Sequence, residues 1–427
     1  MDLTGPNGLV RRVLRSPTVV YTGLAALSRA SSILLAPFLT RHLTSAEYGD
    51  LAFYQSAAGV LGMLLSLGLL AAITRFFFEG SDRASALAKA GGVARWLFLF
   101  VGGGAAVLLA ALVLSPMSES NKHHWLSTVL AAVGTASIAV PLALARARQL
   151  PFVVLWLAIA ELGGLVVATL TLVGPLGRGL NGALEAMAVS GAISAVTALA
   201  VVFLSVPGKL VGAHLREALR FSVPFIPHFI ANQLLTIGDR WILKANGLEA
   251  RLGPYALASQ LSSPIGMIVA AHNETASAEL GEQSRERGKD WLHAQLPRLA
   301  KGYYRIALPL CLVASASAPL LPILFSDRFA EASLLLPLLG LSLLVEVLYY
   351  PAANILFFAN ATRYIPVLSV AAGVVSLVLN LVLIPRWGAW GAMASRLLAM
   401  SLRSALAAWL ALRVTRPKAA VASSLLP

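Results

Sequence analysis

The residues of this chain that could do chemistry are charged side chains set within long apolar stretches. Arg29 lies in such a stretch, near residues 19–39. A guanidinium keeps its charge, and its planar fork pairs well with phosphate oxygens, so Arg29 is a candidate anion-binding residue on a central path. The alternative is a structural arginine neutralised by a buried acid such as Glu161 or Glu346.

Two further arginines, Arg396 and Arg403, lie seven residues apart in the apolar stretch 391–412. This spacing places them on one face of a helix, two turns apart, where their charges repel unless an anion lies against them. The pair therefore predicts a path for a phosphorylated substrate. The alternative is that Arg403 snorkels towards water while an outer loop satisfies Arg396.

An acid and a base, Asp239 and Arg240, follow Gly238 near the end of the apolar stretch 221–243. Adjacent residues on a helix do not face each other, so each needs another partner. Asp239 could carry a coupling proton or ion, because acids inside membrane segments often belong to relays; a structural lock is the alternative. The same two alternatives remain for Glu161 and Glu346.

Signatures of other chemistries are missing from the sequence. No Gly-Lys-Ser or Gly-Lys-Thr follows a glycine-rich segment, which excludes a P-loop, and we expect Gly102-Gly103-Gly104 to serve close helix packing. The histidines lack metal-ligand spacing, and Cys311 is the single cysteine. The sequence therefore predicts no catalytic residue, no metal site and no cofactor.

The composition is typical of a multi-pass membrane protein, with 58% hydrophobic and 12% charged residues. The net charge of +14 does not indicate nucleic-acid binding, because the basic residues lie mostly in short loops between apolar stretches. We expect twelve transmembrane helices, near residues 19–39, 51–72, 96–114, 125–145, 151–173, 182–204, 221–243, 255–271, 303–325, 333–358, 365–384 and 391–412.

The basic residues also predict the orientation. If the N-terminus is cytoplasmic, the inner segments carry 22 Lys and Arg residues and the outer loops carry 8. This imbalance places both termini in the cytoplasm. The largest hydrophilic segment, 272–301, would then be cytoplasmic, and we expect it to form an amphipathic helix at the lipid surface.

The two halves of the chain echo each other. Gly49-Asp50-Leu51-Ala52 is matched by Gly253-Pro254-Tyr255-Ala256, and Gly179-Leu180-Asn181-Gly182-Ala183 by Gly388-Ala389-Trp390-Gly391-Ala392. The offsets, 204 and 209, are nearly equal. Six spans per half predict parallel repeats: an all-α protein with an N-terminal lobe, 1–206, and a C-terminal lobe, 207–427, around a central cavity.

Four segments carry a family resemblance. They are Leu35–Gly49 (LAPFLTRHLTSAEYG); Leu67-Gly68-Leu69 with Thr74-Arg75-Phe76; Phe221-Ser222-Val223-Pro224 with Gly238-Asp239-Arg240, Gly253 and Tyr255; and Asn380 with Ile384-Pro385, Gly388 and Gly391-Ala392. In this order they resemble the first, second, seventh and eleventh-to-twelfth spans of the polysaccharide (O-antigen) flippases. Those flippases belong to the multidrug/oligosaccharidyl-lipid/polysaccharide (MOP) exporter superfamily.

The resemblance implies two six-helix lobes and alternating access in the bacterial inner membrane. The substrate would be a polyprenyl-pyrophosphate-linked oligosaccharide, moved from the cytoplasmic to the outer leaflet without chemical change, so the protein would not be an enzyme. Related lipid II flippases use arginines of the first helix in a cationic cavity, and Arg29 matches them in kind. A glycan polymerase and glycosyltransferases would be its partners.

Two other functions compete with this interpretation. A multidrug exporter of the same superfamily moves cations and would need acids in its cavity, whereas the deep charges here include three arginines. A membrane glycan polymerase or glycosyltransferase would need a sizeable loop outside the membrane, and the outer loops here are short.

Overall fold

The computed structural model describes residues 33–79 and 82–416, and within these ranges it contains helices and no strands. The predicted all-α membrane fold is confirmed. The chain divides into two units, residues 1–227 and 228–427. These units are defined by contacts within the chain, whereas the predicted lobes 1–206 and 207–427 are defined by the repeat in the sequence. The boundary between residues 206 and 207 stays a prediction. Arg29 lies outside the described residues.

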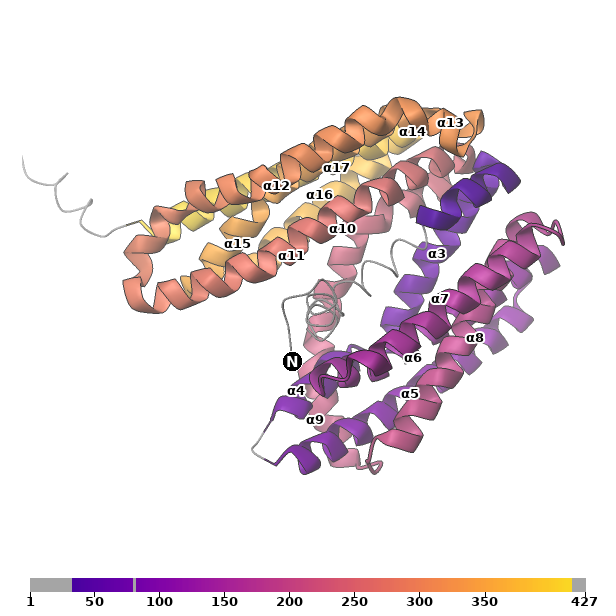
Figure 1. Ribbon diagram of the computed structural model, residues 1–427, viewed down its shortest axis with the longest axis horizontal. Coiled ribbons are helices and arrows are strands. Elements are labelled where there is room, and N and C mark those ends of the chain that lie inside the picture. Colours follow the sequence, from indigo (N-terminus) through magenta and orange to yellow (C-terminus); the bar gives the residue numbers. More distant parts are fainter. Residues whose placement is uncertain (1–32, 80–81, 417–427) are drawn as a thin grey trace, which may run out of the picture. The chain divides into compact units, whose positions relative to one another are not determined.

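The helices of the first unit follow one another through short connections (Figure 1). After helical residues 33–42 they are α3 (Ser45–Leu65), α4 (Leu69–Phe78), α5 (Arg83–Leu114), α6 (Glu119–Ala147), α7 (Pro151–Val173), α8 (Gly179–Ser205), α9 (Gly212–Ser222) and the 3-10 turn η1 (Val223–Phe225).

The second unit begins within α10. Its elements are α10 (Ile226–Ala245), α11 (Glu249–His293), α12 (Gln295–Ser317), η2 (Ala318–Leu320), α13 (Leu321–Phe325), η3 (Asp327–Phe329), α14 (Glu331–Val347), α15 (Tyr349–Phe358), α16 (Tyr364–Trp387) and α17 (Ala389–Val414).

Eight helical segments in the described part are long and apolar enough to cross a membrane, or nine if the bent pair α3 and α4 is one span. The predicted count of twelve is thus not confirmed. The first predicted span lies mostly outside the described residues. The predicted spans 221–243 and 255–271 are helical, as α10 and the first part of α11, without being among those eight or nine.

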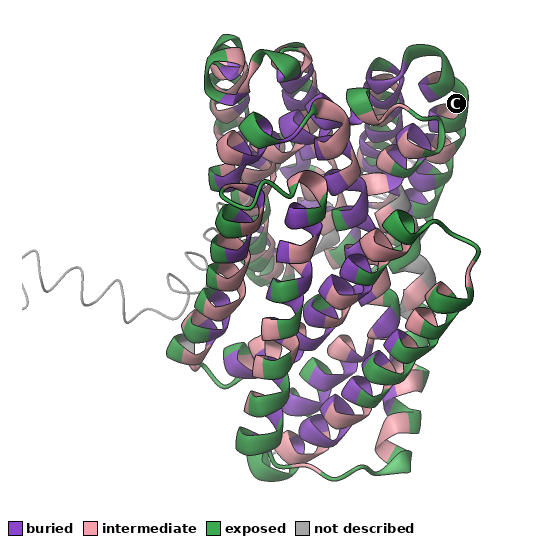
Figure 2. Ribbon diagram, turned by 90° about the vertical axis from the view of Figure 1, so that its right-hand side faces the viewer, coloured by how far each residue is buried: buried purple, intermediate pink, exposed green. Residues whose placement is uncertain are grey.

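The surfaces of these helices fit a lipid environment. Figure 2 shows buried positions on the inner sides of the helices and exposed positions on their outer sides. Many of the exposed side chains are large and apolar, for example Leu114, Leu204 and Ile323, which are 84%, 86% and 77% exposed. Hydrocarbon chains rather than water can cover such a surface.

Two predicted spans are interrupted helices rather than continuous ones. The span near 51–72 bends by 54° between α3 and α4, where Leu67 and Gly68 have φ values of 48° and 66°, a left-handed conformation that ends a helix. The span near 333–358 breaks at Leu348. Pro351 lacks the N–H that would bond to the carbonyl of Val347.

The hydrophilic segment 272–301 is helical, as predicted, apart from Ala294, but it is not a helix of its own, and its place at a lipid surface stays a prediction. α11 continues through this hydrophilic segment as one helix of 45 residues, about 68 Å long, and the chain turns back at Ala294 into α12 (Figure 1). Leu280 and Leu292 near the end of α11 are buried in one cluster with Ile355 of α15. This apolar stripe stabilises the helix beyond the length a bilayer needs.

Glycines set the closest helix approach in the first unit. A Cβ atom on Gly134 of α6 would lie 2.3 Å from the Cα of Gly191 in α8, so the two backbones touch there. Close helix packing was expected at Gly102-Gly103-Gly104, and it is found only at Gly104, where a Cβ would lie 2.6 Å from Leu65 Cδ2. At Gly102 and Gly103 a Cβ would meet nothing within 4 Å.

The segment that leads from α8 to α9 lies directly on α5. A Cβ on Gly91 would lie 2.2 Å from the carbonyl oxygen of Pro207, and one on Gly92 would lie 2.4 Å from that of Lys209. Either side chain would push the segment away, so these glycines permit the contact.

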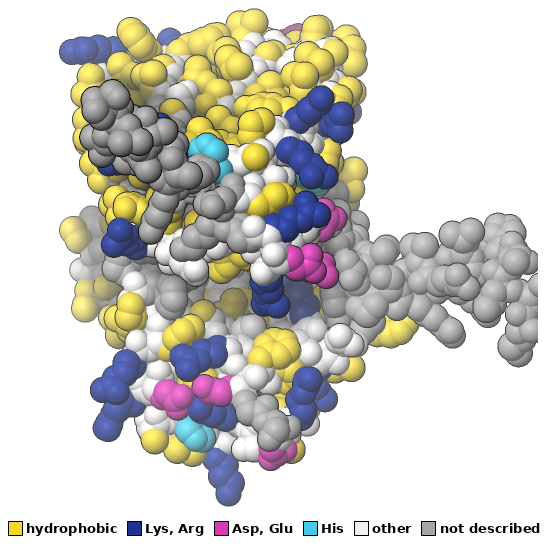
Figure 3. All heavy atoms as spheres, turned by 90° about the vertical axis from the view of Figure 1, so that its left-hand side faces the viewer, with side chains coloured by type: hydrophobic (Ala, Val, Ile, Leu, Met, Phe, Trp, Pro, Cys, Tyr) yellow, Lys and Arg dark blue, Asp and Glu magenta, His cyan; other side chains and the backbone are white. Residues whose placement is uncertain are grey.

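Side chains then fix α9 to α4 and α5. Lys89 Nζ lies 3.1 Å from a carboxylate oxygen of Glu79 and 3.0 Å from one of Glu217, and Arg75 stacks on the ring of Phe221 at 4.6 Å. The hydrogen bond from Lys89 lowers the pKa of Glu79. Figure 3 shows basic and acidic side chains side by side on the first unit.

Candidate functional site

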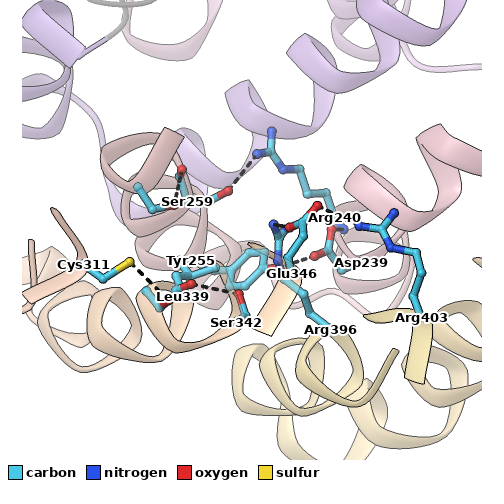
Figure 4. Close-up of polar contacts among 12 residues, drawn as sticks. Asp239, Arg240, Tyr255, Ser259, Cys311, Leu339, Ser342, Glu346, Arg396 and Arg403 are labelled. Carbon is cyan, nitrogen blue, oxygen red and sulfur yellow. Dashed lines mark hydrogen bonds and ion pairs between the residues drawn. The ribbon is translucent and has the colours of Figure 1, made fainter. Parts of the chain in front are cut away.

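Five charged side chains from three helices of the second unit lie together (Figure 4). Asp239 and Arg240 come from α10, Glu346 from the last turn of α14, and Arg396 and Arg403 from α17. We call these five residues the charge cluster. It contains all the predicted site residues except Arg29 and Glu161.

Glu346 bridges Arg396 and Arg403 of α17. Arg403 Nη2 donates a hydrogen bond to Glu346 Oε1 at 2.8 Å, and Arg396 Nη2 lies 3.9 Å from Glu346 Oε2. The seven-residue spacing places both guanidinium groups on the same face of α17, as predicted. Arg403 also lies over the ring of Tyr349, with 4.2 Å between its Cζ and the ring centroid.

These side chains are largely shielded from the outside of the protein. The side chain of Arg403 is 6% exposed, and those of Arg396 and Glu346 are 17% and 18% exposed. Arg403 is therefore buried and paired rather than snorkelling. The partner of Arg396 is an acid on a helix, not an outer loop.

Asp239 is held by a tyrosine. The hydroxyl of Tyr255, on α11, donates a hydrogen bond to Asp239 Oδ2, and the backbone N–H of Arg240 donates to Asp239 Oδ1 at 2.7 Å. Arg240 Nη2 lies 3.4 Å from the hydroxyl of Ser259. Arg396 is close enough to Tyr255 and Asp239 to interact with both electrostatically. Asp239 and Glu346 therefore share Arg396 as a neighbour.

Positive charge exceeds negative charge in the charge cluster, with three arginines against two carboxylates. Moreover, the Nε atoms of Arg396 and Arg403 are buried and have no hydrogen-bond partner within the described ranges. A buried donor without a partner costs about 1–3 kcal/mol, and more when it is charged. The arrangement thus has both the charge and the free donors to bind an anion.

Glu161 does not belong to the charge cluster. It is half-buried on α7 in the first unit, and its backbone carbonyl accepts a hydrogen bond from Ser190 at 2.8 Å. Its role as a coupling or structural acid stays a prediction. In the described part of the chain, no group of three His, Cys, Asp or Glu residues could hold a metal ion, and Cys311 is buried against the carbonyl of Gly340.

Sequence reasoning missed two members of the site. Tyr255 was recognised only as part of the family pattern, and Tyr349 was not singled out. A tyrosine in an apolar stretch is usually a packing residue, and no spacing rule links Tyr255 to an acid on another helix.

The sequence matches the family model described as polysaccharide biosynthesis protein over residues 16–277. This is more than half of the chain. The chain belongs to the polysaccharide biosynthesis protein family. The predicted family resemblance is thereby confirmed. No curated protein matches the sequence.

Solved structures similar to this polysaccharide biosynthesis protein are transporters of the MOP superfamily. The lipid II flippase MurJ in an inward closed conformation has a TM-score of 0.70 at 12% identity, over 92% of this chain and 87% of that one. An inward-facing multidrug resistance MATE transporter has a TM-score of 0.69 at 14% identity, over 93% of this chain and 96% of that one.

A third similar structure is a MOP superfamily transporter from Pyrococcus furiosus, described as having a binding pocket of reverse polarity. Its TM-score is 0.58 at 13% identity, over 94% of this chain and 95% of that one. At such identities the likeness concerns the fold. The polysaccharide biosynthesis protein is thus a multi-pass membrane protein with the fold of MATE and MurJ transporters.

Proposed function

We propose that this protein is a flippase that moves a polyprenyl-pyrophosphate-linked oligosaccharide from the cytoplasmic to the outer leaflet by alternating access. The observation that carries the proposal is the excess of positive charge in the charge cluster, with unused donors on Arg396 and Arg403. Guanidinium groups bind phosphate oxygens through paired N–H donors. Family membership supplies the glycan context.

In this proposal Arg396 and Arg403 bind the pyrophosphate, and Arg29 contributes from the first helix. The lobes 1–206 and 207–427 are the parts that alternate, and both termini face the cytoplasm of a bacterial cell, with the protein in the inner membrane. Glycosyltransferases would supply the substrate and a glycan polymerase would use it. The protein makes or breaks no covalent bond.

A multidrug or cation exporter is the second candidate, because MATE transporters share the fold. It would need acids that are available to a cationic substrate. Glu346 is instead engaged by two arginines and Asp239 by Tyr255. The excess of arginines in the charge cluster therefore favours an anionic substrate.

The experiment that tests the proposal uses the full chain in vesicles loaded with a fluorescent polyprenyl-pyrophosphate-linked oligosaccharide. The fraction accessible to an external lectin should rise in vesicles that contain the protein. A neutral glycolipid with the same sugars should move much more slowly, and a lipophilic cationic dye should not be moved. Transport of the dye without movement of the pyrophosphate-linked glycan would contradict the proposal and support the exporter.

The Asp239→Asn substitution is expected to reduce flipping by about 10-fold or more and to remove its response to an imposed proton or sodium gradient. It keeps an acceptor for Tyr255 but removes the charge, and hydrogen bonds to charged groups contribute about 1.5–3 kcal/mol. Flipping and membrane abundance should be measured together, with Tyr255→Phe as the variant that keeps the carboxylate. Normal gradient response in the Asp239→Asn variant would remove Asp239 from the coupling step, and a parallel loss of abundance would assign it a structural role.

A further inference from the structure

Glu346 occupies the position at which the proposed function requires a phosphate group. Its two oxygens each face a different arginine, Oε1 towards Arg403 and Oε2 towards Arg396. We propose that Glu346 is an internal counter-anion that the pyrophosphate of the substrate displaces. The inference rests on the proposed function and assigns Glu346 a role different from that of a coupling acid.

The geometry of the bridge is uneven. Arg403 is held at hydrogen-bond distance, 2.8 Å, whereas Arg396 is 3.9 Å from its carboxylate oxygen. A single carboxylate thus engages one guanidinium well and the other poorly. A pyrophosphate has more acceptor oxygens and more negative charge, so it can satisfy both groups and reach the Nε atoms that Glu346 leaves without a partner.

The empty protein also needs such a counter-anion. An arginine that is buried without a partner strongly destabilises a protein, and a flippase must pass through a state without substrate on every cycle. Glu346 neutralises the arginines in that state. Because Glu346 competes for the same arginines, it also lowers the net affinity of the protein for the pyrophosphate, which favours release of the substrate.

The backbone around Glu346 allows the side chain to change partners. Glu346 is the penultimate residue of α14, and the helix breaks at Leu348 before α15 begins. Tyr349 and Tyr350 follow immediately, and Tyr350 is close enough to Glu346 to interact with it electrostatically. Two hydroxyl groups next to the break are candidate hydrogen-bond donors for the displaced carboxylate.

The test is the affinity of the purified full-length protein for inorganic pyrophosphate, measured by calorimetry and by the shift in thermal unfolding. Glu346→Gln keeps the shape of the side chain and removes its charge. This variant should bind pyrophosphate at least about 10-fold more tightly than the wild type, which corresponds to about 1.4 kcal/mol, and its unfolding temperature should rise further on binding. The same variant should flip more slowly, because release becomes slow.

Two controls keep the result interpretable. Glu331→Gln neutralises an acid at the other end of the same helix and should leave pyrophosphate affinity at the wild-type value. If Glu346→Gln does not accumulate as folded protein, Glu346→Asp shortens the bridge without removing the charge and should still bind pyrophosphate more tightly than the wild type. Sulfate in place of pyrophosphate should produce a smaller shift.

The inference and the proposed function fail in different ways. Unchanged or weaker pyrophosphate binding in a folded Glu346→Gln variant, with intact flipping by the wild type, would make Glu346 a structural partner and overturn the inference alone. Absence of pyrophosphate binding in every variant together with a wild type that does not flip the glycan lipid would overturn both.

Discussion

Replacing Arg403 with alanine is expected to lower the flipping rate by about 30-fold or more. Truncating one partner of a buried, hydrogen-bonded charge pair costs about 2–5 kcal/mol, and the lower bound corresponds to about 30-fold. Arg403 is the best-bonded cation of the charge cluster, at 2.8 Å from Glu346 and 6% exposed. The measurement is lectin accessibility of the fluorescent glycan lipid in vesicles, normalised to the amount of folded protein.

Two variants separate loss of substrate binding from loss of structure. Arg413→Ala removes the same side chain from an exposed position on the same helix, where it stacks on Trp409, and should flip normally. The double substitution Arg403→Met with Glu346→Gln removes this ion pair and leaves Arg396 with Asp239 as its neighbouring acid, so part of the lost stability should return while flipping stays low. Wild-type flipping by this double variant would show that Arg403 only neutralises Glu346.

Substitution of Gly134 by leucine is expected to reduce the amount of folded protein in the membrane by about 5- to 30-fold. The new Cβ would need the space occupied by the Cα of Gly191, 2.3 Å away, so α6 and α8 must separate. Overpacking of this kind costs about 1–3 kcal/mol, and 1–2 kcal/mol already changes the folded fraction by about that factor. Size-exclusion chromatography of a fluorescent fusion protein measures it directly.

The matched control is Gly102→Leu on α5. A Cβ at Gly102 meets nothing within 4 Å, and leucine favours a helix more than glycine does, so this variant should accumulate like the wild type. Equal accumulation of the Gly134→Leu and Gly102→Leu variants would mean that the contact between α6 and α8 does not limit folding.

The sequence predicted the parts of this structure that depend on local pattern. Apolar stretches of sufficient length predicted membrane helices, and the spacing of Arg396 and Arg403 predicted their common face because helical periodicity alone fixes it. The break near Pro351 has a local cause of the same kind, since proline removes a backbone donor.

Contacts between distant helices could not be predicted in the same way. The pairing of Glu346 with Arg396 and Arg403 was not predicted, because no sequence rule tells which helix lies next to α14. The bend at Leu67-Gly68 was missed because a leucine with positive φ is rare. The continuity of α11 was not predicted, because the many charged residues of this segment hide the apolar stripe formed by Leu280 and Leu292.

Residues 206–222 are attached to α4 and α5 along most of their length. Gly91 and Gly92 allow this segment to lie directly on α5, and the ion pair of Lys89 with Glu217 holds α9 against α5. The connecting segment therefore packs as part of the first unit. The next element, η1, is a three-residue 3-10 turn whose central Pro224 has a fixed φ. Residues 206–222 therefore have little conformational freedom of their own, although they contain the turn between two helices.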